Sequence, residues 1–207
     1  MGYKIETWSD RMAQRTDMSS QVVHLTRDRD DAKLAQVMYE IVASKKLKGS
    51  STKSGFICGK TPAVCFQDAP LVSVCQNVYY EQKYKKQNPA AKTRYKACGV
   101  SFSKPYAFKK GARPVIYDKT ADAKNYLPED QWWRIVNFDL GNNEALVDWT
   151  HEREWRAPGD FLFELSKATL LFVNEVTLRS FLKLCAENAL DIMNEVEGIV
   201  TMRNLLF

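Results

Sequence analysis

Charged and aromatic residues are densest between Asp148 and Arg156, where the sequence reads DWTHEREWR. If this segment is a strand, residues two positions apart point to one side, so Glu152, Glu154 and Arg156 share a face. The two carboxylates then lie roughly 6–7 Å apart at their Cβ atoms. Like charges that close raise the pKa of one carboxyl group, and a nearby guanidinium opposes the rise. The pair suits general-base work or stabilisation of a cation, but a charged edge strand explains the same residues.

A second candidate group lies near the start of the chain, in the β-rich run Gln21–Thr26 (QVVHLT). His24 stands there between Val23 and Leu25, a position where histidine is most often structural and donates to a carbonyl. Thr26 follows two residues later and shares its face if the run is a strand. Because strand ends at a sheet rim commonly line ligand sites, His24 and Thr26 are candidate hydrogen-bonding groups.

Aromatic pairs and a basic segment are weaker candidates. Tyr79-Tyr80 and Trp132-Trp133 are core residues by default, although a flat ligand would need one or two rings to stack on. Positive charge concentrates between Lys83 and Arg113, which indicates either a solvated surface or a track for phosphate or nucleic acid. The sequence contains no GxGxxG, GxxxxGK[ST], GxSxG or HExxH motif. Five cysteines without a C-x-x-C pair and only two histidines give no zinc pattern, so no metal is expected.

Hydrophobic patterns and turn residues predict the elements that position these groups. A helix should run from Leu34 to about 47–49, capped by Asp30 or Asp31, and another from Leu71, with Asp68 as N-cap and Pro70 in its first turn. A closing helix is expected over Glu175–Glu195. Strands are predicted at Gln21–Thr26, Ala63–Gln67, Cys98–Ser103, Pro114–Tyr117, Trp133–Asp139, Arg153–Ala157, Phe161–Leu165 and Thr169–Val173. Helices beside a mainly antiparallel sheet indicate an α+β fold.

Composition and length place limits on the whole chain. Its 207 residues, 45% apolar and 27% charged, fit one globular domain. We expect an N-terminal extension over 1–20, a core over 21–173, and a C-terminal helix and tail over 174–207. The formal charge of +5 permits a phosphate-bearing partner without requiring one. No signal peptide or membrane-spanning run is visible, so the protein is expected in the cytoplasm, away from membranes.

Three short strings in order suggest a family. They are HLT at His24–Thr26, AVCFQDAP at Ala63–Pro70, and EREW at Glu152–Trp155, and the similarity spans about residues 21–165. The chain resembles the AbiGi-type abortive-infection proteins of bacterial phage defence and, more distantly, the DarT-like nucleic-acid ADP-ribosyltransferases. The resemblance implies an ADP-ribosyltransferase-like fold: a split, mainly antiparallel β-sheet with flanking helices, with NAD bound as substrate in its cleft.

The same resemblance implies roles for single residues. Glu154 would be the catalytic carboxylate, and Glu152 a second acid that positions the acceptor. His24 would hold the adenosine-side ribose of NAD, and Thr26 would line the nicotinamide pocket. The remaining NAD-binding candidates are Arg27 or Arg156 for the pyrophosphate, and Phe66, Tyr79 or Tyr80 for the nicotinamide ring.

The leading functional hypothesis is therefore an NAD-dependent ADP-ribosyltransferase that modifies a nucleic acid or a protein in phage–bacterium conflict. The alternative is a non-catalytic antitoxin or inhibitor on the same scaffold, which would bind a partner protein of a toxin–antitoxin pair. A third hypothesis, a nuclease or nucleic-acid binder that uses the basic segment, is weakened by the scarcity of histidines and the lack of an acidic metal cluster.

Overall fold

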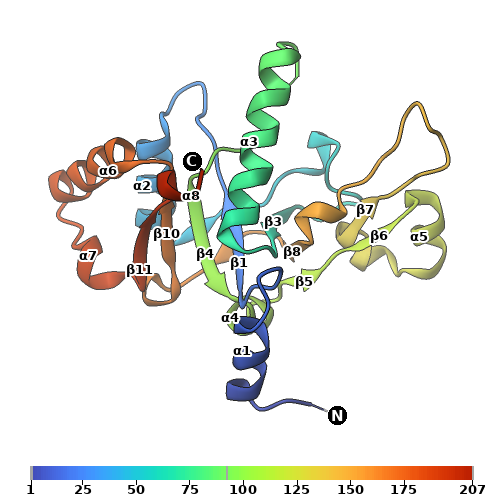
Figure 1. The fold of residues 1–207 in the computed structure, drawn as a ribbon, viewed down its shortest axis with the longest axis horizontal. Coiled ribbons are helices and arrows are strands. Elements are labelled where there is room, and N and C mark those ends of the chain that lie inside the picture. The colour runs from blue at the N-terminus through green and yellow to red at the C-terminus, as the bar shows by residue number, and fades with distance from the viewer. Residues whose placement is uncertain (1, 92, 207) are drawn as a thin grey trace.

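The computed structural model describes residues 2–91 and 93–206. Within these residues seven strands form one mainly antiparallel sheet (Figure 1). Its spatial order is β11 (Gly198–Thr201), β10 (Thr169–Phe172), β4 (Gly99–Ser103), β1 (Gln21–Leu25), β3 (Ala63–Gln67), β8 (Glu154–Pro158) and β5 (Arg113–Pro114). β10 and β11 run parallel, and the other neighbours in this sheet are antiparallel.

Smaller strand pairs and helices surround this sheet. β2 (Lys46–Leu47) pairs with β9 (Phe161–Leu162), and β6 (Ile116–Asp118) runs parallel to β7 (Ile135–Asn137). The α-helices are α1 (Ile5–Ala13), α2 (Leu34–Ser44), α3 (Leu71–Gln87), α4 (Lys104–Lys109), α5 (Thr120–Tyr126), α6 (Glu175–Glu187), α7 (Ile192–Glu195) and α8 (Arg203–Leu206). Short 3₁₀ turns are η1 (Thr52–Ser54), η2 (Glu129–Arg134), η3 (Thr150–Glu152) and η4 (Leu165–Lys167). This arrangement confirms the α+β class.

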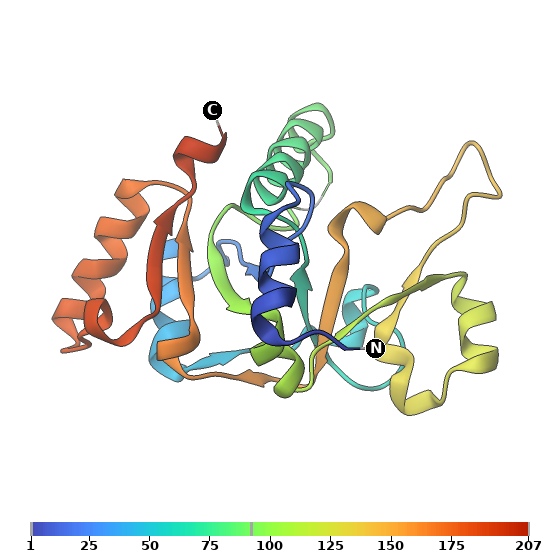
Figure 2. The ribbon, with the colours of Figure 1, turned by 60° about the horizontal axis from the view of Figure 1, so that its bottom comes forward.

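Helices cover both faces of the central sheet. Val22 and Val23 are adjacent in β1 and point to opposite faces, and both are fully buried. Val22 packs in a cluster with Met38 of α2 and Phe181 of α6. Val23 packs in another cluster with Val74 of α3. The sheet is thus the middle of three layers, with α3 on one side and α2 and α6 on the other (Figures 1 and 2).

α2 and α3 begin at the predicted residues Leu34 and Leu71, but the carboxylates predicted to cap them are wrong. The first amide of α2, that of Leu34, donates to Asp28 Oδ1 at 2.9 Å, not to Asp30 or Asp31. Residues 29–32 close a small bridge that brings Asp28 back to the helix start. Asp68 does not cap α3 either. Its carboxylate accepts from Lys104 Nζ at 2.7 Å and from the indole of Trp155 at 3.2 Å.

Other boundaries shift where local geometry overrides the apolar pattern. α2 ends at Ser44, before the predicted 47–49, because Lys45 takes a left-handed conformation with φ 51°. The strand predicted over Trp133–Asp139 is partly a 3₁₀ turn, and β7 holds only its residues 135–137. The closing helix predicted to reach Glu195 breaks after α6. Beyond α7 the chain returns as β11, so the expected tail adds a strand to the central sheet.

Gly99 of β4, which pairs with Leu25 of β1, leaves no room for a side chain. A Cβ built on Gly99 would lie 1.9 Å from the carbonyl oxygen of His24. Gly99→Ala is therefore expected to push β1 away and to lower the free energy of unfolding by about 3 kcal/mol. Urea denaturation measures this loss.

Gly198→Ala is the matched control, because a Cβ at that strand glycine meets only Thr169, at 3.8 Å. It should leave the free energy of unfolding unchanged within about 0.5 kcal/mol. Equal free energies of unfolding for the two alanine variants would contradict the close approach at Gly99.

Three further features bear on function. None of the helices in residues 2–91 and 93–206 combines the length and apolarity that a bilayer span needs. All five cysteines lie in the described residues, and all are free thiols. No group of three metal-ligating side chains comes together within those residues.

Candidate active site

The sheet opens between β1 and β3. β1 pairs with β4 along its whole length, from Gln21 to Leu25. With β3 the described residues give a single register pair, Val23 with Gln67. Beyond it the strands diverge, and His24 Nδ1 lies 2.9 Å from the carbonyl oxygen of Cys65. A side chain thus occupies an acceptor that would otherwise belong to the ladder, and the divergence leaves room for a ligand.

A cavity of about 530 Å³ lies at this divergence, within the usual size range of small-molecule sites. Segments far apart in the sequence line it, from β1 at one end to β8 at the other. The cavity brings together these predicted site residues: His24, Thr26, Arg27, Phe66, Glu152, Glu154 and Arg156. Tyr79 and Tyr80 do not line it. They lie on the outer side of α3, 55% and 64% exposed, because the inward face of that helix carries Val74, Cys75 and Val78.

Glu154 and Arg156 form a buried ion pair in the cavity wall. Arg156 Nε donates to Glu154 Oε1 at 2.8 Å, and a terminal nitrogen donates to Oε2 at 3.1 Å. The remaining guanidinium donors go to the carbonyls of Trp133, Ile135 and Phe56 at 2.9–3.1 Å. The edge-strand interpretation is wrong, because β8 lies between β3 and β5. All five N–H groups of Arg156 are used, so this residue is not available to a pyrophosphate.

Glu152 is not on the strand with Glu154. It ends the 3₁₀ turn η3, and Arg153 then takes a left-handed conformation with φ 45° before β8 begins. The turn still directs Glu152 into the cavity, where its Oε1 accepts a hydrogen bond from the Tyr95 hydroxyl at 2.9 Å. Burial, and then the neighbouring charge of Glu154, raises the pKa of Glu152 to about 7. The expectation that one carboxyl group of the pair has a raised pKa is confirmed.

His24 makes the structural hydrogen bond to a carbonyl that its position predicted, and it also lines the cavity. A carbonyl oxygen only accepts, so the bond to Cys65 requires that Nδ1 carry the proton. Burial lowers the pKa of the imidazole, which keeps the ring neutral. Nε2 is then an acceptor, suited to a hydroxyl group of a ligand in the cavity.

The other predicted residues at the cavity have their own local partners. Thr26 extends the pairing beyond β1, because its N–H donates to Cys98 and its carbonyl accepts from Lys96. Arg27 is exposed, and its guanidinium donates to the carbonyl of Thr93. Phe66 is fully buried and packs edge-on against His24, with ring centroids 6.0 Å apart. Phe66 therefore supports His24 from the core and offers no open face for stacking.

Sequence reasoning did not single out several residues that line the cavity, among them Lys48, Gln67, Tyr95 and Trp149, and it named Arg94 only as a member of the basic segment. The guanidinium of Arg94 lies 3.8 Å from the ring centroid of Trp149 and also forms an ion pair with Glu81 of α3. Trp149 stands beside the acidic pair in the sequence, so a signal for it existed. Tyr95 and Arg94 follow α3 in an irregular segment, where no periodic pattern marks a residue that faces a cavity.

The basic segment between Lys83 and Arg113, which begins in the last turns of α3, is not one continuous track. Lys85 donates to backbone carbonyls, Lys96 pairs with Asp28, and Lys104 is the buried partner of Asp68. Lys110 pairs with Glu164. Lys92 lies outside the described residues. Much of the charge that the sequence concentrates here is therefore held by local partners, and Arg94 is the member that lines the cavity.

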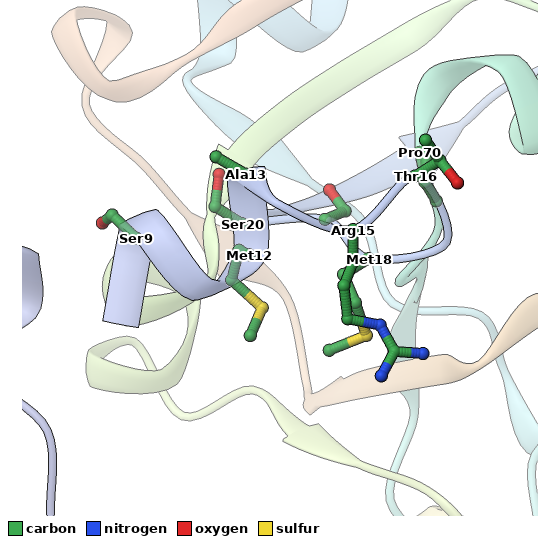
Figure 3. A pocket seen from close by; sticks show the side chains of 9 residues that line it. Ser9, Met12, Ala13, Arg15, Thr16, Met18, Ser20 and Pro70 are labelled. Carbon is green, nitrogen blue, oxygen red and sulfur yellow. The ribbon is translucent and has the colours of Figure 1, made fainter. Parts of the chain in front are cut away.

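A second hollow of about 400 Å³ lies between α1 and Pro70, at the start of α3 (Figure 3). Small and apolar side chains such as Ser9, Met12, Ala13 and Met18 dominate its lining. Arg15 is the charged group there, and Asp17 already pairs with it at 2.7 Å. This hollow offers no group for acid–base work, so the cavity between β1 and β3 is the candidate active site.

Comparisons with protein-family models, with curated proteins and with solved structures give no match to this chain. What the cavity can do must therefore be inferred from its own groups: a neutral imidazole with one free acceptor, a carboxyl group with a raised pKa, a locked Glu–Arg pair, and cations on Arg27, Lys48 and Arg94.

Proposed function

We propose that the protein is an NAD-dependent ADP-ribosyltransferase whose reaction takes place in the cavity between β1 and β3. One observation carries the proposal: His24 and the Glu152/Glu154 pair, far apart in the sequence, line the same cavity. A hydrogen-bonding group and a carboxylate facing one sugar-sized space are what cleavage of a glycosidic bond requires.

The finer fold assignment belongs to the same proposal. The divergence of β1 and β3 after the Val23–Gln67 pair supports a split sheet of the ADP-ribosyltransferase type. The resemblance to AbiGi-type proteins supports a role in phage–bacterium conflict, with a nucleic acid or a protein as acceptor.

In this proposal, His24 binds the adenosine-side ribose of NAD, and Glu152 acts on the ribose that is joined to nicotinamide. Nε2 of His24 accepts a hydrogen bond from a ribose hydroxyl, which fixes the sugar against β1. Glu152 stabilises the positive charge that develops at the anomeric carbon as nicotinamide departs. Glu154 was expected to take this role, but both of its oxygens accept from Arg156. We therefore assign two roles to Glu154: it forms the ion pair with Arg156 in the cavity wall, and its charge raises the pKa of Glu152.

The bond changes balance without a further reagent. The bond between the anomeric carbon and the nicotinamide nitrogen breaks, and its electron pair leaves with nicotinamide. A lone pair of the acceptor forms the new bond to the anomeric carbon. The acceptor's proton passes to ionised Glu152, whose pKa of about 7 suits a general base near neutral pH.

Cations that line the cavity suit the pyrophosphate of NAD. Arg156 is excluded because its donors are occupied, which leaves Arg27, Lys48 and Arg94. Trp149 and Tyr95 are aromatic residues at the same cavity and replace Tyr79 and Tyr80 as candidates to contact a flat ring.

Glu152→Gln tests the catalytic assignment. The variant keeps the size of the side chain and an acceptor for Tyr95 but removes the base. Release of nicotinamide from labelled NAD is expected to fall by about 100-fold to 1,000-fold. The assay should offer separate pools of DNA, RNA and protein as acceptors, with the label on the ADP-ribose part to follow transfer.

Glu144→Gln is the control, since Glu144 is an exposed turn residue of the same β7–β8 connection, outside the cavity. It should keep the parental rate. Turnover by the Glu152 variant at the parental rate would reject the assignment. No turnover by the parental protein, together with a co-purifying partner and no thermal shift with NAD, would favour the non-catalytic binding module.

A further inference from the structure

A chain of hydrogen bonds leads from α3 through the sheet to Glu152. Asn77 of α3 donates from Nδ2 to Gln67 Oε1 at 3.2 Å. Gln67, at the end of β3 and 5% exposed, forms a side-chain hydrogen bond with the Tyr95 hydroxyl. That hydroxyl donates to Glu152 Oε1 at 2.9 Å. The carboxyl group is thus tied to a helix, a strand and a loop.

The direction of this chain is fixed by chemistry. The single proton of a phenol cannot be donated twice, so Tyr95 gives it to Glu152 and accepts from the Gln67 amide. The Gln67 carbonyl oxygen then accepts from Asn77, which settles the orientation of the Gln67 side chain. Burial raises the pKa of Tyr95 well above its usual range, so the phenol stays a donor throughout the pH range of interest.

The chain engages one carboxyl oxygen of Glu152 and leaves the other for the ligand. Within the described residues, Tyr95 is the side-chain donor to this carboxyl group, and it contacts Oε1. Glu152 lines the cavity. Glu154 differs, because Arg156 engages both of its oxygens. Of the two acids, Glu152 is therefore the one with an oxygen to which no side chain of the described residues donates.

We propose that Tyr95, oriented by Gln67 and Asn77, is the positioning residue of the active site: it holds Glu152 with one oxygen toward the reacting sugar and favours its ionised form. This inference rests on the proposed function for its catalytic meaning, but the contact itself is testable without catalysis. A hydrogen bond to a carboxylate stabilises the charged form, so its loss moves the titration of Glu152 to higher pH.

Other charged and titratable groups also face Glu152 and act in the same titration. They are Glu154 of β8, Arg94 beside Tyr95, Glu81 of α3, Tyr117 of β6, Cys65 of β3, and His24, Lys48 and Arg156 across the cavity. Tyr95→Phe changes none of these groups and removes only the hydroxyl.

Tyr95→Phe is expected to shift the acidic limb of the pH–rate profile for nicotinamide release upward by about one pH unit. The rate should fall about tenfold at pH 6 and much less at pH 9. Asn77→Ala, which frees Gln67, should shift the limb in the same direction by less. Tyr126→Phe is the matched control, because Tyr126 also donates to a carboxylate, Asp118 at 2.8 Å, but outside the cavity.

A second measurement separates this inference from the proposed function. Carbon-13 NMR of glutamate-labelled protein follows the carboxyl titration of Glu152, assigned by the signal that Glu152→Gln removes. Tyr95→Phe should raise this midpoint by about one unit whether or not NAD is consumed. An unchanged midpoint, or an equal loss of rate at every pH, would overturn the positioning role. A shifted midpoint in a protein without turnover would reject the transferase and keep the contact.

Discussion

Glu152→Gln is expected to make the protein more stable above pH 7 while it lowers turnover by about 100-fold to 1,000-fold. The pKa of Glu152 is about 7 in the folded protein against an ordinary value of 4.5. The folded state therefore binds a proton more tightly than the unfolded chain, and ionisation of Glu152 costs stability as pH rises from about 4.5 to about 7. A shift of this size corresponds to about 3 kcal/mol. The glutamine has no proton to lose, so the variant escapes this penalty.

Urea denaturation of the parental protein and the variant at pH 4, 6 and 8 measures the difference. The two proteins should have the same free energy of unfolding at pH 4. The difference should grow with pH until the variant is more stable by about 3 kcal/mol at pH 8. Glu144→Gln should show no such separation. A Glu152→Gln variant that is less stable at pH 8 would mean that the carboxylate is structural. Greater stability with lost activity is the signature of a residue retained for function.

Arg156→Met is expected to be the most destabilising of the changes considered, with a loss of about 3–5 kcal/mol. It leaves the Glu154 carboxylate buried without its partner and removes the donors to the carbonyls of Trp133, Ile135 and Phe56. An unpaired buried carboxylate takes up a proton more readily, so the loss should be larger at pH 8 than at pH 5.

Two companions make this measurement specific. Arg156→Lys keeps the charge but lacks the planar fork, so it should recover only part of the stability. The double variant Glu154→Gln, Arg156→Met removes the unpaired charge. Its loss of stability should vary less between pH 5 and pH 8 than the loss of the single arginine variant. A pH-independent loss in the single variant would show that the orphaned carbonyls, not the carboxylate, dominate.

Sequence reasoning located the two ends of the site because each lies on a strand with a clear pattern. β1 and β3 were predicted from short apolar runs, and the observed bounds differ by at most one residue. His24 and Glu154 lie on strands of the central sheet, so a correct prediction of the strands also predicted where these two side chains lie. The pairing of β1 with both β3 and β4 was not readable from either strand alone, because partner choice depends on contacts across the whole chain.

The remaining site residues escaped because they lie where no periodicity exists. Tyr95 belongs to an irregular segment, and only the structure shows that its hydroxyl contacts Glu152 and Gln67. Glu152 was expected to share a strand face with Glu154 if Asp148–Arg156 were extended, but Glu152 lies in η3 and the left-handed Arg153 separates it from β8. Tyr79 and Tyr80 were chosen as aromatics near a motif, and only the packing of α3 shows that they point outward.

The central position of β1 has a consequence for how quickly the protein acquires its native state. This early strand finds its neighbours at Gln67 and at Gly99–Ser103, and the sheet is complete only when β10 and β11 have joined beyond β4. Sheets built from such long-range pairings fold slowly, because loop-closure entropy must be overcome before the contacts form. After dilution from denaturant, fluorescence from Trp149 should therefore recover late, with the final ordering of the cavity.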